Sequence, residues 1–267
     1  MTRYTVNASI LLTDLPLLER PAAVRQAGFS AVEFWWPFPQ AVPADRDVDA
    51  FVIAVQDAGV QLTGLNFFAG DMAGGDRGLV SWKSRTSEFV DNLDVVAGIG
   101  ERLGCRAFNA LYGLRNDECT ADEADALGVE NLVRAAQAVS DIGGTVLLEP
   151  VSGADAYPLK TAAEVLAVID RVEAAGADNI ALLADFYHLS VNGDDVDAVV
   201  RDHAPQFGHV QIADAPGRGQ PGSGELPIEQ WIRDAESGGY DGWVGLEYKT
   251  TDADPFSWLP RDQRANS

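Results

Sequence analysis

Three carboxylates in this sequence end runs of apolar residues. Glu149 ends the run TVLLE, Asp185 ends IALLAD and Glu247 ends WVGLE. Apolar runs of this length are typical of strands that are covered on both faces of a parallel sheet. If the three strands belong to one barrel, their carboxylates meet at its C-terminal mouth, where barrel enzymes carry their active sites.

Such a cluster of acids needs a counter-charge. Like charges repel and each carboxylate loses hydration on burial, yet the whole chain has only three lysines. A bound cation would offset both costs. The segment HVQIAD adds Gln211 or Asp214. The set Glu149, Asp185, Gln211 and Glu247 offers only oxygen atoms, which suits Mg²⁺ or Mn²⁺ better than Zn²⁺. The competing interpretation is that each acid separately caps a helix or pairs with an arginine.

The three histidines call for different interpretations. His188 follows Asp185 within the sequence DFYH, so beside a metal site we expect it to hydrogen-bond the substrate. His209 alternates with Gln211 along a strand and points into the barrel two residues deeper, which predicts a buried, hydrogen-bonded histidine. His203 lies in a helical stretch, and we expect no catalytic role for it.

Other polar residues end the remaining strands. Glu33, Asn66 and Asn109 end the second, third and fourth expected strands. They either line the pocket or fix the adjoining loops by hydrogen bonds. Trp35 and Trp36 either form an apolar pocket wall or belong to the core.

The elements that must position these residues alternate along the chain. Expected strands cover 4–10, 31–35, 61–67, 106–111, 145–150, 180–186, 207–213 and 242–248. Expected helices cover 15–27, 47–58, 84–103, 121–142, 162–175, 195–203 and 227–238. This alternation is typical of parallel β/α architecture. Because no GxGxxG follows the first strand, we favour a (β/α)8 TIM barrel over a doubly wound open sheet.

One TIM-barrel domain is expected to take up residues 1–267, with the tail at about 253–267 as an extended or helical appendage. The chain length suits a single barrel. Thr120 and Thr161 each open a helix with the spacing of a capping box. Two loops, 68–82 and 214–226, are rich in glycine, which suits backbone that bends sharply or closes over a ligand.

The composition excludes several classes of function. The net charge of −22 opposes binding to nucleic acid and to anionic membranes. No apolar run approaches the ~18 residues of a membrane span. The N-terminus enters a strand at once, so we expect no signal peptide. With two cysteines and no CxxC spacing, the cytoplasm is the expected location.

Along nearly its whole length the chain resembles the hydroxypyruvate isomerases of the xylose-isomerase-like (β/α)8 superfamily. The short motifs LEP at 148–150 and DFYH at 185–188 are shared across the superfamily. The loop AGDMAGGDRG at 69–78, HVQIAD at 209–214 and YDGWVGLEYK at 240–249 are specific to this subgroup. The sequence departs from the relatives at 151–160 and 112–119, near the expected substrate pocket.

The resemblance implies that Glu149 and Glu247 are an acid–base pair and that both bind metal with Asp185 and Gln211. The implied reaction interconverts hydroxypyruvate and tartronate semialdehyde through an enediolate stabilised by Mg²⁺ or Mn²⁺. His188 would hold a substrate oxygen. The substrate carboxylate needs a cation, for which Arg77, Arg218 and Lys249 are the candidates, and Asn66 and Glu33 are further candidates for the pocket lining.

Three alternatives stay open. A keto-sugar 3-epimerase, or an isomerase or dehydratase of a keto acid, would use the same metal constellation. A nuclease acting at damaged DNA would need several zinc-binding histidines and a basic surface. A non-catalytic protein that binds sugar acids would not need two glutamates. Assembly into a homo-oligomer is compatible with the sequence, but no segment indicates an interface.

Overall fold

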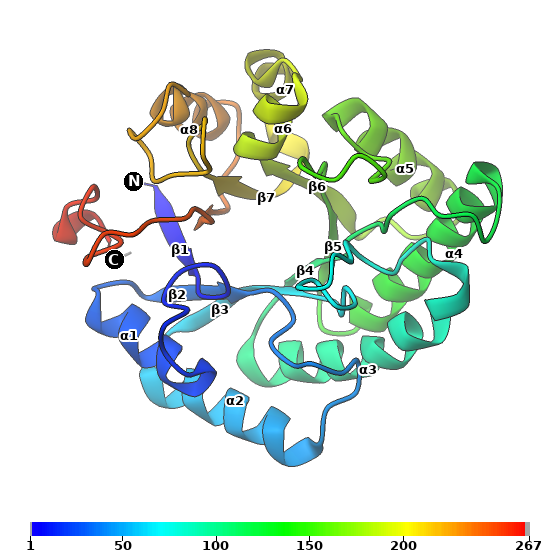
Figure 1. The fold of residues 1–267 in the computed structure, drawn as a ribbon, viewed down its shortest axis with the longest axis horizontal. Helices are drawn as coiled ribbons and strands as arrows, with labels where there is room; N and C mark the ends of the chain where they lie inside the picture. Colours follow the sequence, from blue (N-terminus) through cyan, green and yellow to red (C-terminus); the bar gives the residue numbers. More distant parts are fainter. Residues whose placement is uncertain (1, 265–267) are drawn as a thin grey trace.

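The computed structural model describes residues 2–264. Eight parallel strands, each paired with its neighbour in chain order, close into a barrel where the first strand pairs with the last (Figure 1). They are β1 (Arg3–Asn7), β2 (Ala31–Phe34), β3 (Gln61–Asn66), β4 (Ala107–Asn109), β5 (Thr145–Leu148), β6 (Ile180–Asp185), β7 (Phe207–Ile212) and β8 (Trp243–Leu246). The predicted (β/α)8 TIM barrel is confirmed.

Helices surround the barrel on its outside (Figure 1). They are α1 (Arg20–Gln26), α2 (Asp45–Ala58), α3 (Thr86–Leu103), α4 (Ala121–Ser140), α5 (Ala162–Ala174), α6 (Phe186–Asn192), α7 (Val196–His203) and α8 (Ile228–Ser237). Both predicted capping boxes are present, with Thr120 opening α4 and Thr161 opening α5. None of the described helices has the length and apolar character that a membrane span requires.

One helix was not predicted. We expected the sixth strand to run through Phe186, but α6 begins at that residue. The Asp185 carboxylate accepts hydrogen bonds from the backbone N–H groups of Tyr187 and His188, at 2.9 and 3.1 Å. A strand-ending acid therefore also caps a helix, which satisfies N–H groups that a first turn leaves unpaired.

A polar layer fills the barrel interior beneath its C-terminal mouth. Glu33 accepts hydrogen bonds from Asn7 (3.0 Å) and Gln211 (2.8 Å), and it pairs with His209 at 2.6 Å. Pairing between β2 and β3 shifts register between Val32 and Glu33, and such an irregularity re-aims the side chain that follows it. The prediction that His209 is buried and hydrogen-bonded is confirmed.

The tail after β8 consists of turns and a short 3₁₀ helix at Arg261–Gln263. The rings of Phe256 and Phe29 lie 4.8 Å apart between centroids. The Arg264 guanidinium donates to the carbonyl oxygens of Ala27 (3.1 Å) and Phe256 (2.6 Å). The tail thus packs on the segment between α1 and β2; residues 265–267 of the expected appendage lie outside the described residues.

The polar layer leaves no room at Gly245 in β8. A Cβ there would lie 2.7 Å from Glu33 Oε1 and 2.9 Å from Gln211 Cγ. We expect Gly245→Ala to lower the free energy of unfolding by about 1–3 kcal/mol, as overpacked interiors do. Urea unfolding followed by circular dichroism measures it.

Gly98→Ala in α3 is the matched control, because a Cβ at Gly98 would meet nothing within 4 Å. Alanine stabilises a helix by roughly 0.5–1 kcal/mol relative to glycine. Equal urea midpoints for the two variants would contradict the tight packing around Gly245.

Candidate active site

Three buried carboxylates meet at the C-terminal mouth of the barrel. Glu149 follows β5, Asp185 ends β6 and Glu247 follows β8, and their exposed fractions are 6, 1 and 5%. Ligand atoms of Glu149, Asp185 and His188 lie within 4.8 Å of one another. The structure therefore brings Glu149 and Asp185 together, and Arg218 lies 3.8 Å from Asp185 and 2.6 Å from Glu247.

Burial and repulsion favour the neutral form of two of these carboxyl groups, Glu149 and Glu247. Burial is the main cause that raises the pKa of Glu149, and the charge of Asp185 raises it further. Burial also raises the pKa of Glu247, which the guanidinium of Arg218 lowers in part. A cation placed among the three acids would reverse these shifts, because it favours the charged form of each.

Gln211 in β7 is the register partner of Asp185 in β6. Its Nε2 donates to Glu33, which fixes the orientation of the amide because a carboxylate only accepts. Its Oε1 is buried and has no hydrogen-bond partner among the described residues. Since β7 pairs with both β6 and β8, this oxygen lies between Asp185 and Glu247 around the barrel. Unpaired buried oxygen is costly, and the donor set fits Mg²⁺ or Mn²⁺.

His188 meets the site as a hydrogen-bond donor. Its Nδ1 accepts from the Ser152 backbone N–H at 3.0 Å, so the proton of the neutral ring lies on Nε2. That atom is 3.6 Å from Asp185 Oδ2. Burial lowers the pKa of His188 to about 4, so the ring is neutral near pH 7. Although His188 is close enough to ligate a metal, neither ring nitrogen has a free lone pair.

Arg218 lies among the carboxylates. Its Nη2 is 2.6 Å from Glu247 Oε1 and 3.8 Å from Asp185 Oδ2. Its guanidinium also lies over the ring of Tyr187, 5.4 Å from the centroid. Both interpretations of the acids hold in part: Asp185 caps a helix and Glu247 pairs with an arginine, yet the acids still share one site.

Asp214 shapes the loop that carries Arg218. The fully buried Asp214 carboxylate accepts from the backbone N–H groups of Gly222, Gly224 and Leu226 at 2.9–3.0 Å. Of the two residues that this strand offered, Asp214 orders the loop, and Gln211 lies beside Asp185 in the pairing of β6 with β7.

A cavity of about 710 Å³ opens above the acids. Arg77, Arg218 and Lys249 all line it, as do Asn66 and His188. The Arg77 guanidinium donates to the backbone oxygens of Met72 (3.1 Å) and Asp76 (2.6 Å). Glu33 lies apart from these candidates, because it is 2% exposed and bonded within the polar layer.

Sequence reasoning missed several contacts. The Trp35 indole N–H donates to Glu247 Oε1 at 3.2 Å, across 212 positions of sequence. Asn109 donates to Glu149 Oε1 at 2.8 Å. Ser152, which orients His188, lies in the loop that follows Glu149. Strand-end position pointed to Asn109, but no local signal pointed to Ser152.

The chain belongs to the xylose isomerase-like TIM barrel family. The family's sequence model matches residues 21–265 of this chain. A Streptomyces coelicolor protein, provisionally named a hydroxypyruvate isomerase, is 51% identical over 98% of this chain and 97% of its own length. The hydroxypyruvate isomerase of Escherichia coli is 31% identical over 97% of this chain and 98% of its own length. The 2-oxo-tetronate isomerase of Cupriavidus necator is 31% identical over 93% of each chain.

Among solved structures, one described as an AP endonuclease of family 2 from Brucella melitensis is similar, with a TM-score of 0.87 and 30% identity. The match covers 97% of this chain and 98% of that one. The sequence resemblance to hydroxypyruvate isomerases is confirmed by the curated relatives, and the chain is an isomerase.

The raised carboxyl pKa values predict how stability responds to pH and metal. A carboxyl whose pKa is raised by folding favours the folded state below its ordinary value of 4.5. This contribution is lost as pH rises toward the folded pKa. Without divalent cations, we expect the Tm to fall between pH 5 and pH 8. Excess Mn²⁺ should raise the Tm, and by more at pH 8.

Glu149→Gln removes one of the repelling charges while keeping a similar shape. In EDTA at pH 8 this variant should therefore melt at a higher temperature than the wild type, and Mn²⁺ should shift it little. Differential scanning fluorimetry measures both. Equal Mn²⁺ shifts in the two proteins would contradict a cation site at Glu149.

Proposed function

We propose that this isomerase interconverts hydroxypyruvate and tartronate semialdehyde, with Glu149 and Glu247 as its acid–base pair. The observation that carries the proposal is the pair of buried glutamates, Glu149 and Glu247, that line one cavity at the mouth of the barrel. Two carboxyl groups at one cavity allow one to remove a proton from the substrate while the other returns it.

The reaction moves one proton between neighbouring carbons. One glutamate removes a proton from C3 of hydroxypyruvate, and the electron pair forms the double bond of an enediolate. A proton then reaches C2, while the C3 hydroxyl loses its proton and becomes the aldehyde. The O2 oxygen gains that proton, so substrate and product have the same atoms. Either glutamate can serve as base, depending on the direction.

Glu149, Asp185, Gln211 and Glu247 would hold Mg²⁺ or Mn²⁺, which supplies positive charge that stabilises the enediolate and lowers the pKa of both glutamates. His188 would donate from Nε2 to a substrate oxygen. Trp35 and Asn109 each donate to one glutamate, which orients its carboxylate toward the substrate.

The substrate carboxylate would meet the cations that line the cavity. Lys249 is exposed at the rim, and its backbone N–H donates to the Arg218 carbonyl at 2.7 Å. Arg218 offers a second cation, although its guanidinium also holds Glu247. We assign the carboxylate to Arg218 and Lys249, with Arg77 on the opposite loop. Asn66 is a further substrate contact.

A second candidate is the isomerisation of another 2-keto acid, since one relative is a 2-oxo-tetronate isomerase. Gln211 stands where keto-sugar epimerases of this fold usually carry histidine, which argues against an epimerase. The nuclease activity of the similar structure is not proposed for this chain, because a net charge of −22 repels phosphate backbones.

The test follows hydroxypyruvate by NMR in deuterated buffer with Mg²⁺ or Mn²⁺. Wild-type protein should form tartronate semialdehyde and lose this activity with chelator. Glu149→Gln and Glu247→Gln should each lower kcat by at least ~100-fold, the usual contribution of a general acid or base. The matched control is Glu229→Gln on α8, whose carboxyl is exposed and remote from the cavity.

No turnover by metal-loaded wild-type protein would rule out hydroxypyruvate as substrate. Full activity in both glutamate variants would rule out the acid–base pair, but hydroxypyruvate would still be the substrate.

A further inference from the structure

Arg218 is a resident positive charge among the acids. Its Nη2 lies 2.6 Å from Glu247 Oε1 and 3.8 Å from Asp185 Oδ2, and both acids belong to the set that would hold Mg²⁺ or Mn²⁺. Its side chain is 18% exposed, so little water screens these contacts. A divalent cation bound to the same acids would meet the guanidinium at close range, where like charges repel. Arg218 and the cation therefore compete for the two carboxylates.

The backbone of Arg218 is fixed, so its side chain is the part that can move. Arg218 has a φ of 57°, which is uncommon for a residue other than glycine. Its carbonyl oxygen accepts from the Lys249 N–H at 2.7 Å. The next residue, Gly219, exchanges two backbone hydrogen bonds with Asp214, at 2.8 and 3.0 Å. The guanidinium, in contrast, lines the cavity of about 710 Å³ and has room to rotate into it.

Each group in this ion pair also has a contact outside it. Glu247 Oε1 accepts from the Trp35 indole N–H at 3.2 Å. Asp185 accepts from the backbone N–H groups of Tyr187 and His188. The guanidinium lies over the Tyr187 ring, 5.4 Å from its centroid, and this cation–π contact needs neither acid. The carboxylates would thus keep their orientation after the guanidinium leaves.

The cavity also holds the second cation that a substrate carboxylate would meet. Lys249 lies beside Arg218 because its N–H donates to the Arg218 carbonyl, and both residues line the cavity. A guanidinium that turns away from Glu247 offers two parallel N–H donors, the geometry that binds a carboxylate in bidentate fashion. Arg218 and Lys249 together would then neutralise the anion.

We infer that Arg218 changes partner when the divalent cation binds: it leaves Glu247 and Asp185 and turns to the carboxylate of the substrate. The acids release the guanidinium only when another positive charge replaces it, so the anion site is complete only in the cation-loaded protein. This inference rests on the proposed isomerisation and gives it an order of binding, cation before 2-keto acid. By thermodynamic linkage, an anion that holds Arg218 also tightens the binding of the cation.

The first test measures the affinity for Mn²⁺ by isothermal titration calorimetry and by electron paramagnetic resonance of the free ion. Arg218→Met keeps an apolar stem and removes the charge. It should bind Mn²⁺ at least about tenfold more tightly than the wild type, because the cation no longer has to break a charge-assisted hydrogen bond. In EDTA this variant should melt at a lower temperature than the wild type, and excess Mn²⁺ should remove that difference.

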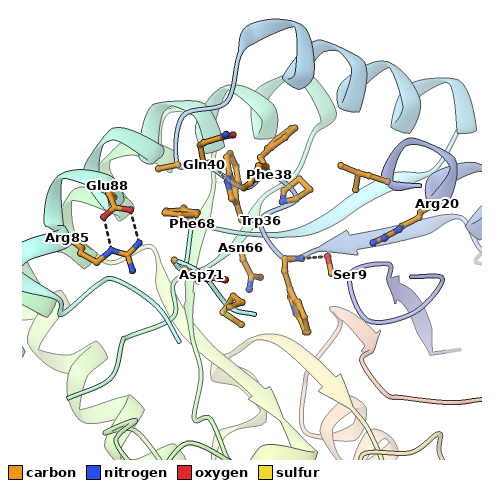
Figure 2. Close-up of a pocket in the computed structure, with 18 residues that line it drawn as sticks. Ser9, Arg20, Trp36, Phe38, Gln40, Asn66, Phe68, Asp71, Arg85 and Glu88 are labelled. Carbon is orange, nitrogen blue, oxygen red and sulfur yellow. Dashed lines mark hydrogen bonds and ion pairs between the residues drawn. The ribbon is translucent and has the colours of Figure 1, made fainter. Parts of the chain in front are cut away.

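Two other arginines provide matched controls. Arg77 lines the same cavity but donates to the backbone oxygens of Met72 and Asp76, so Arg77→Met removes a charge without uncovering an acid. Arg85 pairs with Asp76 and Glu88 beside a cavity between the loops that follow β1, β2 and β3 (the Glu88 pair is drawn in Figure 2). Arg85→Met therefore uncovers acids elsewhere. Both controls should bind Mn²⁺ with nearly the affinity of the wild type.

The second test uses lactate, an unreactive 2-hydroxy acid, as the probe for the anion site. Mn²⁺ should tighten lactate binding to the wild type. In the Mn²⁺-loaded state, Arg218→Met should bind lactate about tenfold more weakly than the wild type, since it lacks the bidentate donor. Equal lactate affinity in the two loaded proteins would overturn the change of partner, because the anion would then not contact Arg218.

Equal Mn²⁺ affinity in Arg218→Met and the wild type would also overturn the inference, and so would an equal gain in Arg77→Met. Absence of Mn²⁺ binding in all four proteins would overturn it together with the proposed cation site. If the Mn²⁺ and lactate results are as expected but hydroxypyruvate is not turned over, the isomerisation alone is refuted and the change of partner is supported.

Discussion

The mouth of this barrel is organised around the mutual repulsion of three buried carboxylates. Two of them, Glu149 and Glu247, hold protons more strongly than free glutamate because water is excluded and Asp185 lies near. Every strong contact around them supplies positive charge or a hydrogen-bond donor. Arg218, Trp35 and Asn109 each reach one of the glutamates. A divalent cation would complete the same compensation.

The polar layer around Glu33, beneath the mouth of the barrel, fixes the orientation of a side chain next to the acids. Glu33 accepts from Gln211 and Asn7 and pairs with His209, so the amide of Gln211 has one orientation. If this layer were apolar, the amide could rotate and turn its N–H₂ group toward the acids. A buried polar network costs little only when its members are satisfied. Here the Gln211 oxygen has no hydrogen-bond partner among the described residues, so this atom can accept a bond or bind a cation.

The barrel and the acids at its mouth could be predicted because both follow from local patterns. Apolar runs gave the strands, and an acid at the end of such a run must reach the C-terminal edge. Helix α6 was missed because it follows β6 without a loop, and one aspartate serves both elements. The contact between Trp35 and Glu247 joins distant parts of the sequence. The turn of Glu33 into the barrel depends on a register shift. Neither this contact nor this register shift produces a periodic pattern in the sequence.

The loop that carries Arg218 holds its shape through its own bonds. Asp214 accepts from Gly222, Gly224 and Leu226, and it also pairs with Gly219 through the backbone. These contacts begin and end within a single connection, and Arg218 joins the loop to the segment after β8 through Glu247 and the Lys249 N–H. Related barrels could exchange it as a unit, between the end of β7 and the start of α8, without rebuilding the strands. Exchange of this one short segment would therefore change the positions of the cations above the acids and leave the acid cluster itself unchanged.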